Sequence, residues 1–279
     1  MPGRQGVAPL RFGTRYHVDR PAHDALARIL ECLPVEKLAG HRESPLRRVL
    51  HRERGEGLSF FGTEFVCDDR FSVESWPARS DLEEIRESIR LARQAADWVV
   101  VSLHTHEYDE RPDQPAAFAA QACREMVDAG AEAVIAHGAH GVRGIELHQG
   151  RPIFHGVGAF VFQPYLFPHQ PSDFHEAYAM EKFSLEATYR MRKEKAGFFK
   201  KRAYWEAMLV RLTFARGDAP AFEVSPIALF DPDAPEPDGL PRLAHNEVGR
   251  DLLRKIQQLS VEMGTPLTLD PDRFTLTCA

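Results

Sequence analysis

Two apolar runs of strand length, each followed by histidine, constrain the fold of this chain more than any other feature. The first is Trp98–Leu103 (WVVVSL) before His104, and the second is Ala133–Ala136 (AVIA) before His137. Such runs predict strands that are buried on both faces. The segment between them, Gln114–Ala129, predicts a helix. The pattern therefore predicts a strand–helix–strand unit within an α/β to α+β fold.

The histidines after these two runs should lie close together, because ligand sites in such sheets form at the carboxyl ends of strands. His137 and His140 flank Gly138 and Ala139, small residues that let the backbone turn so that both rings face one point. Neutral imidazole is a common ligand for zinc, iron and manganese, so we expect this pair to bind a divalent metal ion. The pattern does not distinguish Mn, Fe and Zn.

Further candidates surround this pair. The strand period of two aims His104 and His106 to one face, so that at least one of them would join the same centre. Glu107 is the nearest carboxylate, either for ligation or for orienting a ring. His155 is left open between an additional ligand and an ordinary surface position.

The rest of the chain predicts a scaffold of strands and helices around this centre. The expected strands are Leu10–Val18, Leu58–Val66, Gly144–Leu147, Pro152–Phe154, Met208–Phe214, Ala221–Leu229 and Pro266–Leu269. The expected helices are Pro21–Leu33, a helix capped at Ser80 that ends near Ala96, Phe174–Tyr204 and Asn246–Met263. Residues 231–279 are interpreted as an acidic, proline-rich linker followed by a C-terminal helix and strand appendage.

Composition excludes several classes of protein. With 279 residues and a net charge of −6, the chain has no basic footprint for nucleic acid. Its four cysteines form no CxxC pair, which argues against a disulfide framework or a cysteine zinc site. The sequence shows neither a signal peptide nor a transmembrane run, so a cytoplasmic location is expected unless a preceding segment changes it.

Three stretches carry a resemblance to a known family. They are VVVSLHTHEY, DAGAEAVIAHGAHGVRGIEL and RPIFHGVGAFVFQ. Together they resemble the bacterial CapA family of poly-gamma-glutamate capsule biosynthesis proteins, whose fold is similar to the calcineurin-like metallophosphoesterases. The resemblance implies layered, mixed parallel and antiparallel sheets flanked by helices, with residues 1–230 as a CapA-like domain.

The resemblance also implies a set of metal ligands. His104 matches the lone histidine after a central strand, and His137 and His140 match the paired histidines of the last metal motif. His106, Glu107 and His155 remain as groups that orient these ligands or as extra ligands, and no catalytic acid or base is assigned. The family takes further ligands from a strand that would precede Leu10, so the N-terminal part of the fold is expected to be missing.

The expected function is capsule-related, with a metal-dependent, phosphoesterase-like hydrolase site acting on a small molecule or an anionic polymer. Whether the chain is an enzyme stays open. One alternative is a non-catalytic accessory component that binds a polymer or a protein partner of a capsule assembly system. Another is a fragment that folds poorly, because losing part of a layered sheet exposes strand edges and an apolar face.

Overall fold

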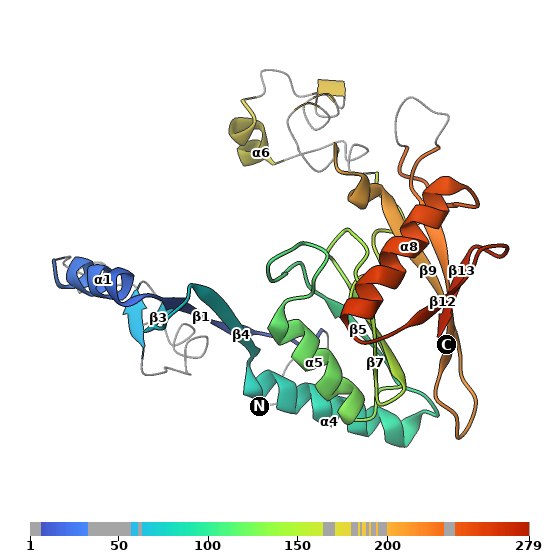
Figure 1. The fold of residues 1–279 in the computed structure, drawn as a ribbon, viewed down its shortest axis with the longest axis horizontal. Helices are drawn as coiled ribbons and strands as arrows, with labels where there is room; N and C mark the ends of the chain where they lie inside the picture. Colours follow the sequence, from blue (N-terminus) through green and yellow to red (C-terminus); the bar gives the residue numbers. More distant parts are fainter. Residues whose placement is uncertain are drawn as a thin grey trace. The chain divides into compact units, whose positions relative to one another are not determined.

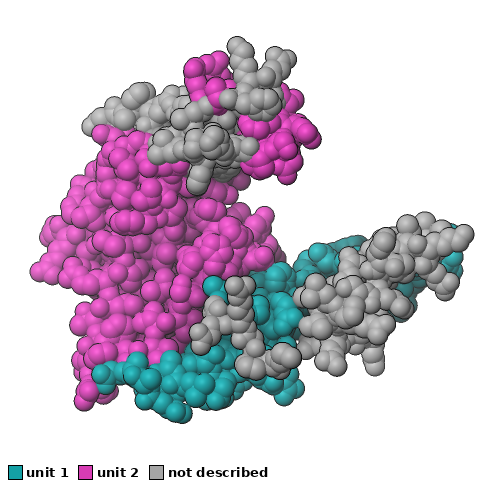
Figure 2. Space-filling model, turned by 180° about the vertical axis from the view of Figure 1, so that it is seen from behind, with its two compact units in different colours: residues 1–97, 116–130 teal, residues 98–115, 131–279 magenta. Residues whose placement is uncertain are grey.

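The computed structural model contains two compact units, which are coloured separately in Figure 2. The first unit comprises Met1–Asp97 and Ala116–Gly130, and the second comprises Trp98–Pro115 and Ala131–Ala279. The residues that the structure describes are 7–32, 57–60, 63–163, 171–179, 184, 186–187, 190, 194, 200–231 and 238–278.

The first unit is built on a sheet with the strand order β2-β3-β1-β4 (Figure 1). Its strands are β1 (Phe12–Val18), β2 (Leu58–Phe60), β3 (Thr63–Cys67) and β4 (Ser72–Pro77). Its helices are α1 (Arg20–Cys32), α4 (Arg79–Ala95) and α5 (Ala117–Asp128). The single strand predicted over Leu58–Val66 is wrong, because β2 and β3 are two strands that pair antiparallel.

The predicted cap of α4 is also wrong. The N-cap position is Ala78, which makes no side-chain cap hydrogen bond, and Ser80 lies inside the helix. The first turn is fixed instead by Asp81, which is 1% exposed and accepts a hydrogen bond of 2.7 Å from the backbone N–H of Arg11. The guanidinium of Arg11 pairs with the same carboxylate, so the residue before β1 holds the start of α4.

The second unit contains two sheets. The first has the order β5-β6-β8-β7, in which β5, β6 and β8 are parallel and β7 is antiparallel to β8. Its strands are β5 (Val100–His104), β6 (Ala133–His137), β7 (Ile145–His148) and β8 (Arg151–Phe154). The predicted hairpin turn is confirmed, with positive φ at Gln149 and Gly150.

One expectation about this sheet is wrong. We predicted β5 to be buried on both faces, but Val100, Ser102 and His104 are exposed while Leu103 is buried. Alternate residues of a strand share one face, so the face of β5 that carries Val100, Ser102 and His104 is exposed, and its apolar run did not show burial on both faces. By contrast, β6 is largely buried, as predicted.

The second sheet of this unit is antiparallel, with the order β11-β10-β13-β12 and with β9 also paired to β10. Its strands are β9 (Glu206–Thr213), β10 (Ala221–Ala228), β11 (Arg242–Leu243), β12 (Leu267–Asp270) and β13 (Thr275–Cys278). The helix α8 (Glu247–Glu262) packs against β10, β12 and β7 (Figure 1). Of the predicted helix Phe174–Tyr204, the structure describes α6 (Ser172–Ala177) and the 3-10 turn η4 (Arg202–Trp205), and most of the remainder lies outside the described residues.

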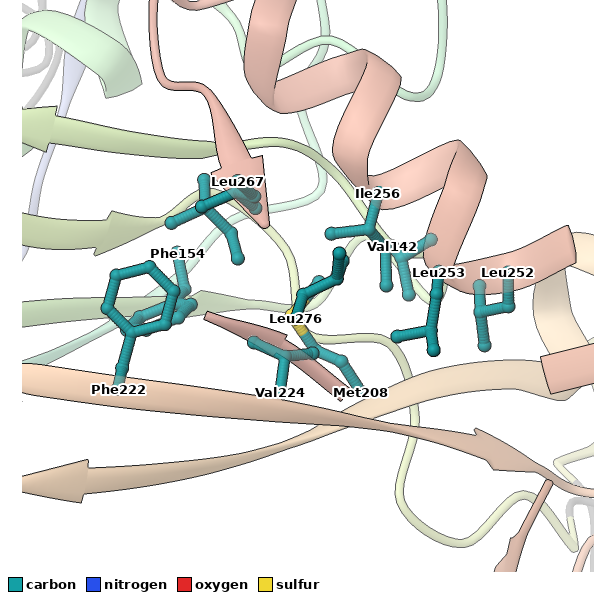
Figure 3. Packing of buried hydrophobic residues seen from close by; sticks show 11 residues of the cluster. Val142, Phe154, Met208, Phe222, Val224, Leu252, Leu253, Ile256, Leu267 and Leu276 are labelled. Carbon is teal, nitrogen blue, oxygen red and sulfur yellow. The ribbon is translucent and has the colours of Figure 1, made fainter. Parts of the chain in front are cut away.

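The core of the second unit joins both sheets and α8. Figure 3 shows side chains from these elements packed on one another. The buried members are Val142, Ile145, Phe154, Met208, Phe222, Val224, Leu252, Leu253, Ile256, Leu267 and Leu276. The C-terminal helix and strands therefore contribute to this core, although the linker composition had indicated an appendage over residues 231–279. Residues 232–237 of the expected linker lie outside the described part of the chain.

The predicted fold class is confirmed. Several mixed sheets are flanked by helices, which is consistent with a metallophosphoesterase-like layered fold. All four cysteines are free, as expected. No helix in the described part of the chain combines the length and the apolarity that a membrane span requires.

Candidate functional site

Two parallel strands bring the first two histidines side by side. In the register of β5 and β6, His104 is the direct partner of His137. The pairing continues one residue further, because the backbone N–H of Thr105 donates to the carbonyl of His137 at 2.9 Å. The predicted approach of the two histidine groups is therefore present in the structure.

The side chains at these strand ends form a continuous row of polar contacts. Ser102 Oγ lies 2.9 Å from His137 Nε2, and His137 Nδ1 lies 3.1 Å from His104 Nδ1. His104 Nε2 lies 3.0 Å from His106 Nε2. The ring of His106 in turn contacts the ring of His140, with 5.4 Å between centroids. We call His104, His106, His137 and His140 the four-histidine group.

The loop after β6 reaches this arrangement through unusual backbone angles. Gly138 has a φ of 103°, and a Cβ at that position would lie 2.9 Å from Thr105 O and 3.0 Å from His104 Nε2. His140 has a φ of 58°, in the left-handed region that residues other than glycine rarely adopt. Strained backbone of this kind concentrates at functional sites.

Aromatic rings border His140 on another side. The ring of Tyr204, from η4, stacks on it with 5.9 Å between centroids and 20° between planes. Phe162 lies 5.8 Å from the same ring. The four-histidine group thus has an apolar wall at its His140 end.

Burial keeps two of these rings neutral. It lowers the pKa of His137, and the nearby His104 lowers it further. Burial likewise lowers the pKa of His140, with additional contributions from His106 and His104. Near neutral pH both rings therefore keep a free lone pair, which metal ligation requires.

Glu107 holds the turn that carries His106. Its carboxylate accepts hydrogen bonds from the Thr105 hydroxyl and, at 3.0 Å, from the backbone N–H of His106. Burial opposes ionisation of this carboxylate, but these hydrogen bonds outweigh it and lower the pKa of Glu107. The residue is thus engaged in supporting the backbone next to a histidine.

His155 has a different environment. It is buried, and its Nε2 lies 2.9 Å from Glu146 Oε2. This nitrogen is engaged by a carboxylate from β7, which suits a pair that stabilises the hairpin of β7 and β8.

The spacing of the ring nitrogens in the four-histidine group can be compared with the spacing around one bound metal ion. Two nitrogens bound to one zinc ion in tetrahedral geometry lie about 3.4 Å apart, and the two contacts of His104 measure 3.1 and 3.0 Å. Within the residues that the structure describes, no group of three or more histidine, cysteine or acidic side chains has the arrangement of a complete metal site. Ligation would therefore require small shifts of the rings.

His104 lies between His137 and His106, and this position limits which nitrogens could bind an ion. A neutral imidazole offers one lone pair, and its other nitrogen carries a proton. If Nδ1 of His104 and Nδ1 of His137 hold the ion, then His104 Nε2–H donates to His106, and His137 Nε2–H donates to Ser102. If Nε2 of His104 and Nε2 of His106 hold it, with His140 nearby, then His104 donates to His137 instead.

Some residues of this site were not found from the sequence. Ser102 lies two positions before His104, so the strand period could have placed both on one face. Tyr204 and Phe162 carry no such signal, because they come from segments far along the chain. His106, expected at the margin of the site, lies between His104 and His140.

Similarity to known proteins is found in the segment that contains the four-histidine group. Residues 43–164 match the model of the bacterial capsule synthesis protein family PGA_cap, and this segment contains all members of the four-histidine group. The PGA biosynthesis protein CapA of Bacillus subtilis (strain 168) is 40% identical over 72 residues, which cover 25% of this chain and 18% of that protein.

Longer similarity is found to two proteins of Sinorhizobium fredii (strain NBRC 101917 / NGR234). The uncharacterized proteins y4sH and y4uA are each 26% identical over an alignment of 285 residues, which covers 99% of this chain. The chain spans 59% of the length of these relatives. The resemblance to the CapA family is therefore confirmed, and residues 43–164, with the four histidines among them, carry it.

Proposed function

We propose that this chain is a CapA-like protein of capsule biosynthesis whose four-histidine group binds one divalent metal ion and supports hydrolysis of a phosphoester. The observation that carries this proposal is the unbroken row of imidazoles at the carboxyl ends of β5 and β6. The family similarity supports the capsule-related role and covers the same residues. The ion is manganese, iron or zinc, and the substrate is a small molecule or an anionic polymer that carries a phosphoester bond.

The residues of the chain would divide the work at this site. A divalent ion supplies a Lewis acid for the phosphoryl oxygen. His137 and His140 offer neutral rings because burial lowers the pKa of each. Ser102 fixes the orientation of His137, and Tyr204 with Phe162 shields the His140 end from water. One ion is proposed because His104 lies between His137 and His106, and its single lone pair cannot bind an ion on each side.

Metal content of purified single variants tests the ligand set. The chain is loaded with Mn²⁺, Fe²⁺ or Zn²⁺, desalted and analysed for metal per chain, beside His137→Ala and His106→Ala. If His104 and His137 hold the ion, His137→Ala abolishes binding, whereas His106→Ala weakens it by about 10- to 100-fold, as loss of an orienting partner does. If His104 and His106 hold it, the two variants exchange these effects.

A matched control is His245→Ala, which removes an exposed histidine that stacks on Phe274. It should retain the metal content of the unaltered chain. Equal and negligible metal in all four proteins would sink the metal proposal.

A second candidate function is a non-catalytic component that binds an anionic polymer or a protein of a capsule assembly system. It is favoured by the state of Glu107, since the carboxylate nearest in sequence to the rings is held by Thr105 and the His106 backbone. Phosphomonoester and phosphodiester assays with added Mn²⁺ separate the two. Turnover that is lost in His140→Ala supports the hydrolase, and absent turnover with retained polymer binding supports the accessory role.

A further inference from the structure

A buried arginine, Arg143, contacts the loop that carries His106 and lies three residues after His140. Arg143 is 1% exposed, and a buried guanidinium ordinarily pairs with a carboxylate. Here it donates to two backbone carbonyls instead, from Nη2 to Glu107 O at 2.9 Å and from Nε to Pro112 O at 3.1 Å. Both carbonyls belong to the loop that follows β5 and carries His106.

Arg143 itself belongs to the segment that follows His140, and it is held there by contacts with Gly156, just after β8. Arg143 is three residues beyond His140, and its backbone N–H donates to Gly156 O at 3.0 Å. Its stem fills the space above Gly156, where a Cβ would lie 3.0 Å from Arg143 Cγ and 3.1 Å from Gly141 O. One residue therefore connects the segment after His140 with the segment after His106.

Burying the Arg143 guanidinium costs desolvation free energy, which an apolar side chain at this position would not require. Burial disfavours the charged guanidinium and lowers the pKa of Arg143, although Glu107, Asp113 and Asp109 oppose that effect. Its Nη1 is buried and has no hydrogen-bond partner among the residues that the structure describes. A neutral side chain would fill this space without desolvating a cation, but it would not hold two carbonyls in a fixed fork.

We propose that Arg143 is a positioning residue that braces the loop after β5 against the loop after β6 and so holds His106 between His104 and His140. This inference deepens the proposed metal function, on which its metal readout rests. A second brace acts further along the same loop, where Arg111 pairs with Glu262 at the end of α8 at 2.7 Å. Arg111 is half exposed, and exposed ion pairs contribute little to stability, so the test is made at Arg143.

The test compares Arg143→Met and Arg143→Lys in the full chain with ¹⁵N-labelled histidine, without metal. The signals of the His106 ring, assigned with His106→Ala, report its contact with His104. In Arg143→Met we expect these signals to shift and broaden, while those of His155, which is held by Glu146, stay in place. Arg143→Lys keeps the positive charge and N–H donors but loses the planar fork that reaches both carbonyls, so it should give an intermediate spectrum.

Metal binding provides a second readout. Zn²⁺ affinity should fall by about 10- to 100-fold in Arg143→Met and by less in Arg143→Lys, as expected for a residue that orients ligands. The control is Arg151→Met, which breaks the pair of Arg151 with Glu132 in the hairpin of the same sheet. It should leave both the His106 signals and the affinity unchanged.

The outcomes separate this inference from the proposed function. A folded Arg143→Met variant with unchanged His106 signals overturns the positioning role, whatever its metal content. If Arg143→Met does not fold, the Arg143→Lys spectrum decides on the same criterion. If the unaltered chain binds no metal, the metal proposal fails, and the ring signals still decide the role of Arg143.

Discussion

Gly138 shows how closely the two histidine loops approach each other. A methyl group there would meet Thr105 O at 2.9 Å and His104 Nε2 at 3.0 Å, in a backbone with φ of 103°. We predict that Gly138→Ala lowers the free energy of unfolding by the cost of the left-handed backbone, about 1–2 kcal/mol, and by a further contribution from this contact. Urea denaturation measures the sum, and metal content should fall with it.

Gly217 provides the matched control at this scale. Its φ of 90° is similar, but a Cβ there would meet no atom of the described residues within 4 Å. Gly217→Ala therefore isolates the backbone cost. Equal losses of stability in the two variants would mean that the contact at Gly138 has no effect.

The proximity of site residues was predictable from the sequence where each residue comes directly after an apolar run of strand length. The runs before His104 and His137 predicted their convergence, because parallel strands end at one edge of a sheet. The hydrogen bonds of the Arg143 guanidinium were not predictable from the sequence. Their acceptors are backbone carbonyls, which every residue has, so the identity of Glu107 and Pro112 gives no sign of them. The order of the rings depends on the left-handed backbone of His140, which sequence spacing does not reveal.

At the scale of elements, the edge of β7 is covered by the end of α8. The N–H of Ile145 donates to Ser260 Oγ at 2.9 Å, and the N–H of Leu147 donates to Thr265 Oγ1 at 2.9 Å. Ser260 is fully buried and also donates to Ile256 O within α8. One hydroxyl in the last turn of α8 and one just after the helix thus take the place of a neighbouring strand.

We predict that Ser260→Ala destabilises the second unit by about 1–3 kcal/mol, because it leaves a buried backbone N–H without an acceptor. Chemical denaturation measures the loss. Ser88→Ala is the control, since Ser88 makes the same type of bond to the preceding helical turn, to Glu84 O, but is exposed. A loss at Ser260 no greater than at Ser88 would show that the edge contact contributes nothing.

Element boundaries were predicted best where capping residues mark them. The predicted helix at α8 is confirmed because Asn246 accepts a hydrogen bond from Gly249 N and Gly264 ends the helix with φ of 76°. The apolar run of β5 correctly predicted a strand. It wrongly predicted burial on both faces, because hydrophobicity alone does not distinguish an edge strand from a central one. β13 was missed because its pairing with β10 and β12 is set by residues distant in sequence.

At the scale of the whole chain, the largest difference between the sequence-based prediction and the structure concerns the packing of the C-terminal segment. An acidic, proline-rich stretch before residue 241 predicted an appendage, yet α8, β12 and β13 supply five of the buried side chains in the core of the second unit. Linker composition describes the local backbone and carries no information about the packing of later segments. A segment after a linker can therefore still complete a core, as Leu253 and Leu276 do between the two sheets (Figure 3).

A C-terminal segment that belongs to a shared core and one that forms a separate appendage should respond differently to Leu253→Ala. Leu253 is fully buried in the shared core, so we predict a loss of about 2–5 kcal/mol in the free energy of unfolding. Val261→Ala, on the same helix at a site that is 57% exposed, should change stability by less than about 0.5 kcal/mol. Hydrogen exchange then distinguishes core from appendage, because a cavity in a shared core also weakens protection of amides in β7 and β10. An appendage would confine that loss to α8, and such a pattern would contradict the single core seen here.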